Sequence, residues 1–314
     1  MKVHNHFDIT GLHYFSAVAE ERSFSRAAAR LRIAQPAVSR RVKALEDDLE
    51  VQLLYRHARG VDLTEAGESL LSSAYALFRH IGDLRENAML AGDTPSGVVV
   101  LGVLPTPGEY IVPRLIAKAK LLYPDIRFRI VEGYSGDLLR MLINQEINMA
   151  IMHALTPHSD VDVEKLLLDY MCIVGPAGSL KKKSYTFKEA ATFPLILQPS
   201  PNLARLRLDQ IAEERGIELN VVMGCHGFWV TKSMIREGLG FSMVTFGSVV
   251  TDLENGLLDV APIEDPAVPW PLVVAVRADQ ASKLSLTAIK KLAAEIVTEL
   301  RSKDIWRQIP GAAD

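Results

Sequence analysis

The sequence contains few cysteines and no long apolar run. Only Cys172 and Cys225 are cysteines among its 314 residues, and their spacing fits neither a metal site nor a redox pair. No apolar stretch approaches the roughly 20 residues that span a bilayer, and the N-terminus has no apolar core of a signal peptide. We therefore expect a cytoplasmic protein with no membrane partner, in which both cysteines are small hydrophobic residues without a disulfide.

The sequence also lacks the motifs of common catalytic sites. It contains no glycine-rich phosphate loop and no paired-histidine metal spacing. The segment Gly-Tyr-Ser-Gly around Ser135 lacks the second spaced glycine of a nucleophile elbow. We therefore expect a protein that is not an enzyme, with no catalytic residues, no metal and no resident cofactor.

Acidic residues are missing from one segment near the N-terminus. Although the chain has a net charge of −3, Arg22 to Lys43 include seven basic residues and no acidic one. Helical spacing of apolar residues predicts one helix over about residues 10–21 and a second up to about Leu31, with Ser23 or Ser25 as N-cap. A basic helix–turn–helix segment is typical of DNA-binding proteins, because Lys and Arg release counterions where they approach phosphates.

The predicted third helix has two distinct faces. Val38, Val42, Leu45 and Leu49 form one stripe at the helical angle of about 100° per residue, and we assign this stripe to the core. The other face is polar and cationic, so it can enter the major groove, where Gln pairs with adenine and Arg with guanine. Its residues are Gln35, Pro36, Ser39, Arg40 and Lys43, with Pro36 in the first turn. A merely solvated basic face is the alternative.

Two short apolar runs around a glycine-containing turn follow, over Val51 to Thr64. This pattern predicts a β-hairpin wing. Arg56 and Arg59 on the wing would contact phosphates or the minor groove, and such contacts position a domain on DNA without specifying sequence.

Residues 7–67 resemble the DNA-binding domain of the LysR-type transcriptional regulators. The resemblance rests on the segments SFSRAAARL, QPAVS, LEDDLEVQLLYR and LTEAG, which occur at uninterrupted spacing. It implies an all-α winged helix-turn-helix domain over residues 7–66, with the helix-turn-helix at about 24–43. Double-stranded DNA is then the partner, and we expect Ser25 among its contacts.

One long helix is expected from Thr64 to about Ala91. A lone helix of this length has little to pack on, so its apolar stripe should bury against a second copy of the chain; packing against the C-terminal domain is the alternative. The stripe consists of Leu70, Leu71, Ala74, Leu77, Phe78, Ile81 and Leu84. The family resemblance implies the same dimerisation through residues 64–92, and further a homotetramer on a pseudo-palindromic promoter site, with RNA polymerase as another partner.

From Val98 onward, apolar strands alternate with helices, which predicts an α/β fold with mainly parallel strands. The expected strands are 98–103, 126–132, 149–153, 171–174, 195–197, 219–223, 241–244 and 271–277, and the expected helices are 112–122, 137–145, 203–215, 229–237 and 283–300. The last strand and helix should return to the first half of this domain.

The family resemblance implies that residues 96–304 form a two-lobed effector-binding domain similar to the type 2 periplasmic binding proteins. Crossings near Glu164–Leu168 and Ile263–Trp270 would connect its lobes. Lobe I would contain residues 96–163 and 268–304, and lobe II residues 164–267. Within the family, the segment VEGYSGDLLRMLINQEINMAIMH resembles regulators of the nitrogen-assimilation-control type.

A small organic effector should bind between the lobes, where strands end and helices begin. Free N–H groups at helix starts favour an anion, so we predict a carboxylate-bearing molecule, although Glu132 would oppose it. The predicted effector-binding residues are Thr106, Pro107, Gly108, Ser135, His153, Ser200, Phe228 and Thr231. Plain helix capping by the hydroxyl residues, a structural role for His153 and core packing of Phe228 are the alternatives.

Three functions are compatible with these features. The leading hypothesis is a sequence-specific DNA-binding transcription regulator whose activity a small effector modulates. The second is a constitutive DNA-binding regulator with an empty cleft. The third is a solute-binding protein or enzyme that uses the same cleft, and the missing export signal and catalytic motifs oppose it.

Overall fold

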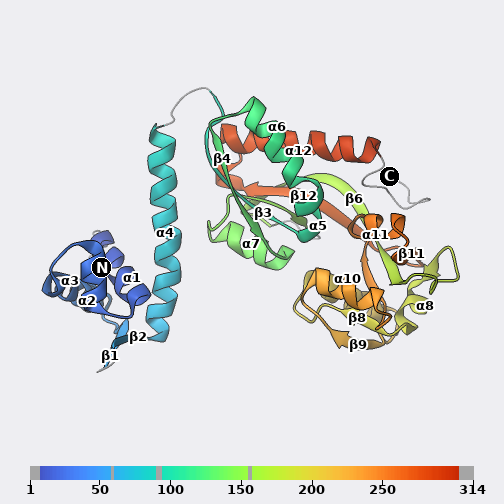
Figure 1. The fold of residues 1–314 in the computed structure, drawn as a ribbon, viewed down its shortest axis with the longest axis horizontal. Helices are drawn as coiled ribbons and strands as arrows, with labels where there is room; N and C mark the ends of the chain where they lie inside the picture. Colours follow the sequence, from blue (N-terminus) through green and yellow to red (C-terminus); the bar gives the residue numbers. More distant parts are fainter. Residues whose placement is uncertain (1–7, 58–59, 90–93, 155–157, 304–314) are drawn as a thin grey trace. The chain divides into compact units, whose positions relative to one another are not determined.

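The computed structural model describes residues 8–57, 60–89, 94–154 and 158–303 (Figure 1). Contacts within the chain divide it into two compact units, Met1–Arg85 and Glu86–Asp314. The N-terminal unit contains α1 (Ile9–Glu21), α2 (Phe24–Leu31), α3 (Gln35–Leu49), β1 (Leu54–His57), β2 (Gly60–Leu63) and the greater part of α4 (Glu65–Met89). Among the described residues, no helix is long and apolar enough to cross a membrane.

The three N-terminal helices pack around one small apolar core. Phe15 of α1 and Val38 and Val42 of α3 are fully buried, and Leu45 is nearly so. The predicted core stripe of the third helix is thus confirmed, apart from its partly exposed end at Leu49. The hydroxyl of Ser23, rather than that of Ser25, caps α2 by accepting a hydrogen bond from the Arg26 amide at 3.4 Å.

The wing and the start of α4 are joined to this core by close backbone contacts. Strands β1 and β2 form the predicted antiparallel hairpin. The hydroxyl of Thr64 caps α4 by accepting from the Gly67 amide at 3.0 Å, and it donates to the Gln52 carbonyl at 2.7 Å. A Cβ on Gly67 would lie 2.2 Å from the Leu53 carbonyl oxygen, so only glycine fits there.

The apolar stripe of α4 has a partner within the N-terminal unit itself. Ala74 is almost completely buried in the core of α1–α3. Four further residues of the stripe, Leu70, Leu71, Leu77 and Phe78, are partly buried against the same core. Ile81 is exposed, and the side chain of Leu84 lies outside the described part. The assumption that this helix has little of its own to pack on was therefore wrong for its first half.

The C-terminal unit has two lobes, each with its own core. The elements mainly of the first lobe are β3 (Gly97–Val103), α5 (Pro105–Tyr110), α6 (Val112–Leu122), β4 (Ile126–Glu132), α7 (Ser135–Ile143), β5 (Met149–His153), β12 (Pro269–Arg277), η2 (Ala278–Gln280) and α12 (Leu284–Ser302). Those mainly of the second are β7 (Tyr185–Thr186), α8 (Phe187–Thr192), β8 (Leu195–Leu197), α9 (Leu203–Glu214), β9 (Val221–Gly224), α10 (Phe228–Arg236), β10 (Ser242–Thr245), η1 (Phe246–Ser248), α11 (Val250–Glu254) and β11 (Leu258–Glu264). Strand β6 (Val161–Pro176) belongs to both lobes (Figure 1).

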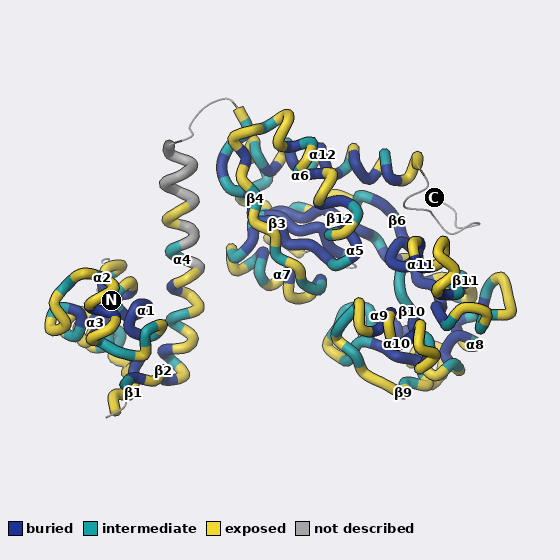
Figure 2. The backbone as a smooth tube through the Cα atoms, in the orientation of Figure 1, coloured by how far each residue is buried: buried dark blue, intermediate teal, exposed yellow. Residues whose placement is uncertain are grey.

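The lobes share one mixed sheet with the strand order β4-β3-β5-β12-β6-β11-β7. The first half of β6 pairs with β12, and its second half pairs with β10 and β11. Leu167 still contributes to the core of lobe I, whereas Met171 contributes to that of lobe II. In lobe I, α6 and α12 cover one face of the sheet and α7 the other (Figure 1), so β3, β5 and β12 are buried between them (Figure 2).

Two expectations for this unit were wrong. The sheet is not mainly parallel, because β6 forms antiparallel pairs with β10, β11 and β12. No helix was expected over Thr106–Gly108, but Pro105 opens the short helix α5 there, at a position where the missing N–H of proline leaves no hydrogen bond unmade.

Candidate DNA-binding face and interlobe cavity

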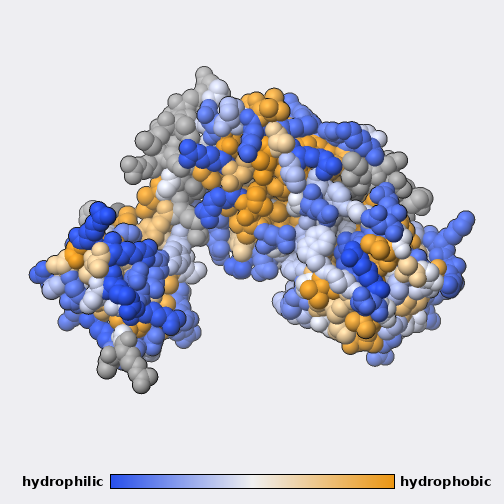
Figure 3. Space-filling model, in the orientation of Figure 1, coloured by the Kyte–Doolittle hydropathy of each residue, from blue (hydrophilic) through white to orange (hydrophobic). Residues whose placement is uncertain are grey.

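The polar face of α3 is open to solvent. Gln35, Pro36, Arg40 and Lys43 are exposed and Ser39 is half-buried. Pro36 lies in the first turn, where its missing N–H costs no hydrogen bond. Figure 3 shows that hydrophilic residues dominate the visible surface of the N-terminal unit. The structure thus brings together on one helix the five residues predicted to read DNA.

Several neighbouring arginines are already neutralised. Arg26 lies 3.7 Å from Glu21 and Arg30 pairs with Glu20. The Arg30 guanidinium holds the pKa of the Glu20 carboxyl below its usual value. Arg41 pairs with Asp8 at 2.7 Å. Within the described part of the chain, neither Arg40 nor Lys43 forms an ion pair. Positive charge therefore remains available on the polar face of α3, which we call the recognition face of this recognition helix.

The wing places Arg56 beside the recognition helix. Its Nη1 donates to the hydroxyl of Ser39 at 3.3 Å, and its guanidinium lies 4.5 Å from the ring centroid of Phe24. Ser25 is exposed in the first turn of α2. The predicted contact Arg59 lies outside the described residues.

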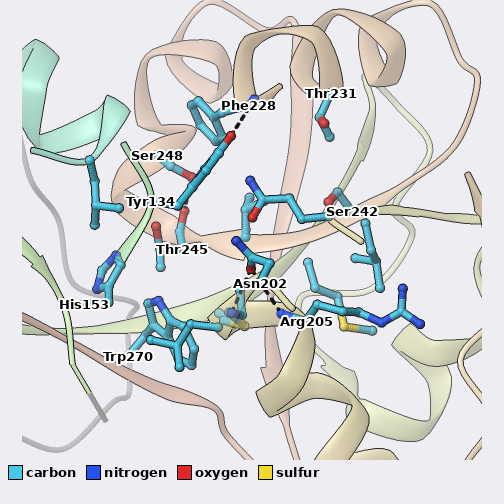
Figure 4. Close-up of a pocket in the computed structure, with 18 of the residues that line it drawn as sticks. Tyr134, His153, Asn202, Arg205, Phe228, Thr231, Ser242, Thr245, Ser248 and Trp270 are labelled. Carbon is cyan, nitrogen blue, oxygen red and sulfur yellow. Dashed lines mark hydrogen bonds between the residues drawn. The ribbon is translucent and has the colours of Figure 1, made fainter. Parts of the chain in front are cut away.

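A cavity of about 120 Å³ lies between the lobes of the C-terminal unit (Figure 4). One water needs about 10–15 Å³ by this measure, so the volume admits a small organic molecule. Lobe I contributes Leu104, Thr106, Pro107, Tyr134, Ser135 and His153. Lobe II contributes, among others, Asn202, Arg205, Leu208, Phe228, Thr231, Thr245 and Ser248, and the crossing strands contribute Met171 and Trp270.

His153 is uncharged at neutral pH. Its Nδ1 lies 3.2 Å from the Pro271 carbonyl, and its ring lies 5.7 Å from that of Trp270. Desolvation lowers the pKa of the imidazole to about 4, against the smaller opposite effect of the carbonyl contact. Figure 4 shows His153 and Trp270 side by side at one end of the cavity.

Several polar groups around the cavity are already satisfied. The Asn202 side chain accepts from the amides of Ala204 and Arg205 at the start of α9. The Arg205 Nε lies 2.8 Å from both carboxylate oxygens of Asp209. The Ser135 hydroxyl accepts from the His153 amide at 3.1 Å. Among the described lining residues, no basic side chain therefore remains both charged and unpaired.

Two tyrosines of lobe I form hydrogen bonds with lobe II. The Tyr134 hydroxyl accepts from the Phe228 amide at 3.2 Å and donates to the His226 carbonyl. The hydroxyls of Tyr110 and Thr251 share a further hydrogen bond. Partial burial raises the pKa of both tyrosines, so both hydroxyls keep their protons at neutral pH.

The structure gathers most of the predicted effector residues. Six of the eight line the cavity: Thr106, Pro107, Ser135, His153, Phe228 and Thr231. Of these, Thr106, Pro107, Ser135 and Thr231 are buried. Gly108 and Ser200 do not, and Ser200 is exposed. The lining also includes Arg205, Thr245 and Trp270, which the prediction omitted. Tyr134 and Asn202, which line it too, come from the segments around the predicted Ser135 and Ser200.

Comparison with known proteins agrees with this division of the chain. The family model for the bacterial regulatory helix-turn-helix protein, lysR family, matches residues 9–68, and that for the LysR substrate binding domain matches residues 92–297. The HTH-type transcriptional regulator BbuR of Bordetella bronchiseptica is 27% identical over 310 residues, which cover 98% of this chain and 94% of the relative. The DNA-binding transcriptional dual regulator OxyR of Escherichia coli is 35% identical over 162 residues, about half of each chain (52% and 53%).

Solved structures show the same fold. Full-length CbnR in complex with its target DNA matches with a TM-score of 0.69 at 21% identity, over 94% of this chain and 100% of that one. A full-length OxyR variant of Pseudomonas aeruginosa matches with a TM-score of 0.62 at 25% identity, over 93% and 98%. The resemblance to regulators of the nitrogen-assimilation-control type stays a prediction. The model for the substrate binding domain alone matches more than half of this chain. The chain therefore belongs to the LysR family of transcriptional regulators, which bind DNA and carry an effector-binding domain.

Proposed function

We propose that this regulator reads DNA with the exposed face of α3 and that a small effector in the interlobe cavity changes its activity. The observation that carries the proposal is that residues of both lobes line one cavity. A molecule that contacts both lobes binds their closed arrangement more tightly than an open one, and this difference in affinity shifts the equilibrium between them.

On the DNA side, we propose base contacts by Gln35, Ser39 and Arg40 and phosphate contacts by Lys43 and Arg56. The exposure of the α3 residues, together with the ion pairs that neutralise neighbouring arginines, supports this assignment. Pro36, Ser25 and Arg59 complete the proposed interface. Together, α3 and the wing would span a major groove and the adjacent backbone.

On the effector side, we propose a small carboxylic acid with an apolar body. Met171, Leu208 and Trp270 supply apolar surface for the body. The hydroxyls of Thr106 and Thr245 supply donors, as does the start of α7. The neutral state of His153 and the Arg205–Asp209 pair leave the acid without a salt-bridge partner in the lining, so hydrogen bonds would have to hold it.

For assembly, we propose a homodimer through α4, on which Tyr75 and Ile81 are exposed. A second contact through lobe I would extend the dimer to a tetramer. The largely exposed Leu121 and its neighbour Leu122 at the end of α6, together with the edge strand β4, support that contact. Two paired DNA-binding domains would then occupy a pseudo-palindromic promoter site, from which RNA polymerase could be contacted.

The effector is tested by thermal unfolding of the full-length protein with small aliphatic and aromatic acids and with the amide of each acid. A saturating acid at about 100 times its Kd should stabilise the protein by about 2.7 kcal/mol, and its amide should stabilise it less. Ser135→Ala should reduce the stabilisation, whereas Ser233→Ala, an exposed hydroxyl outside the lining, should not. A stabilising acid should also change the mobility of the protein–DNA complex.

Two outcomes would overturn parts of this proposal. Equal stabilisation by an acid and its amide would show that the carboxylate is not recognised. No stabilisation by any compound would favour a constitutive regulator whose cavity stays empty.

A further inference from the structure

Glu46 connects the recognition helix to the wing. From the C-terminal half of α3, its Oε1 accepts hydrogen bonds from the Leu53 amide at 2.9 Å and the Leu54 amide at 3.1 Å. These two amides stand at the point where the chain enters β1. The Glu46 side chain is only 14% exposed although it is charged. One carboxylate oxygen therefore fixes where the wing begins relative to the helix.

The second oxygen of Glu46 faces Arg56 on the wing. The Arg56 Nη2 lies 3.8 Å from Glu46 Oε2, while its Nη1 donates to the Ser39 hydroxyl. The ring of Phe24 lies under the guanidinium at 4.5 Å from its centroid. Three groups from the two helices α2 and α3 thus restrict an arginine that is still 45% exposed. A guanidinium has five N–H donors, so most of its donors remain free for a ligand.

Ser39 and Arg56 are suited to a common ligand. Hydroxyl and guanidinium groups are both frequent donors to DNA phosphates, and an arginine fork matches the spacing of phosphate oxygens. Because the two side chains already touch at 3.3 Å, one phosphate can accept from both. An arginine that is held before binding loses less side-chain freedom when DNA binds.

We propose that Glu46 and Phe24 are positioning residues that hold Arg56 beside Ser39, so that the wing and the recognition helix grip one backbone phosphate together. This inference rests on the DNA-binding face proposed above. It adds that the acidic run Glu46–Asp48 at the C-terminal end of α3 contributes to DNA binding through Glu46 and is not only a solvated end of the helix.

The test compares the full-length wild-type protein with five full-length variants on the duplex that the wild-type protein selects from a random-sequence pool. Arg56→Ala should weaken binding about 10-fold and lower the slope of log K against log salt by about 0.9, the value for one lost phosphate. Glu46→Gln should weaken binding about 3- to 10-fold, the range for losing one pre-ordered side chain. Its amide oxygen still accepts from Leu53 and Leu54, so its thermal unfolding should match that of the wild type.

Asp47→Asn is the matched control, because it removes the same charge from the next, exposed position of α3. It should leave affinity unchanged or slightly raise it. In the double variant Glu46→Gln/Arg56→Ala, affinity should equal that of Arg56→Ala alone, since Glu46 acts through Arg56. Phe24→Leu, which removes the stacked ring, should weaken binding in the same direction as Glu46→Gln.

The possible failures are distinct. If Arg56→Ala binds as the wild type does, the proposed DNA-binding face is wrong at the wing. If Arg56→Ala weakens binding but Glu46→Gln behaves like Asp47→Asn, the face stands and the positioning role falls. If the two losses add in the double variant, Glu46 acts on DNA binding by a route other than Arg56, and the inference is again wrong.

Discussion

The recognition face and the interlobe cavity use charge in opposite ways. On α3, Arg40 and Lys43 are exposed, and no ion pair within the described residues neutralises them. In the cavity, His153 is neutral and Arg205 is paired with Asp209. A polyanion is attracted over a distance by unpaired charge, whereas a small ligand in an enclosed site is selected by shape and a few hydrogen bonds. Each region therefore matches the kind of partner it is proposed to bind.

Asp252 extends this comparison, because buried charge in lobe II serves structure. It is 2% exposed and pairs with Lys232, also buried, and with Arg236. Asp252→Asn keeps the shape but leaves Lys232 buried without its counter-charge, so we expect a loss of about 3–5 kcal/mol in the stability of the C-terminal unit. Trp229 and Trp270 lie in this unit, and tryptophan fluorescence during urea unfolding reports on it.

The matched control is Glu189→Gln. It breaks the exposed pair between Glu189 and Lys182 at 2.6 Å, which should change the stability little because water screens exposed charges. A loss of the same small size in both variants would mean that water reaches Asp252. The buried charge of lobe II would then contribute no more to stability than an exposed charge does.

Arg40→Ala tests the unpaired charge of the recognition face. Loss of a base contact should weaken specific binding about 10- to 100-fold, corresponding to about 1–3 kcal/mol, and should weaken non-specific binding much less. Arg41→Ala removes an equal charge from the adjacent position, but Arg41 is already neutralised by Asp8. Electrophoretic mobility shift on the selected duplex and on unrelated DNA measures both effects. Similar losses for the two variants would show that only net charge matters.

His153 tests the neutrality of the cavity. Its pKa is about 4 in the folded protein and 6.5 by its ordinary value, so the unfolded chain binds more protons between these limits. Stability should therefore fall as pH decreases from 7 to 5, by about 2 kcal/mol from this group. His153→Gln, which cannot titrate, should lose less over the same range, as measured by urea unfolding at each pH. Parallel curves for the two proteins would mean that His153 is charged or solvated when folded.

The fold of the N-terminal unit was easier to predict than that of the C-terminal unit, because its core comes from helices that are neighbours in sequence. The stripe of Val38 and Val42, the proline in the first turn of α3 and the wing hairpin all follow from local pattern. The partner of α4 did not, since the contact of Ala74 with α1–α3 joins distant segments.

The C-terminal unit shows where local pattern fails. The first half of β6 carries Asp162 and Glu164, and these charged residues interrupt the apolar pattern that would predict a strand. Both pair with Lys290 of α12 in the folded protein. Local pattern also failed to predict part of the cavity lining. Tyr134 and Trp270 reach it from segments more than a hundred residues apart, and no spacing in the sequence indicates that they meet.

The smallest expected effect concerns Tyr134 and Tyr110, because both form hydrogen bonds between the lobes but only Tyr134 lines the cavity. Tyr134→Phe removes the acceptor of the Phe228 amide at the start of α10, and we expect a loss of about 1 kcal/mol. Hydrogen exchange of the peptide that contains Phe228 should accelerate, since its amide then lacks a protein partner. Tyr110→Phe breaks the contact with Thr251 instead, so it should leave exchange at Phe228 unchanged. If both variants accelerated exchange there equally, the two tyrosines would act only through lobe separation, and Tyr134 would have no local role at the cavity.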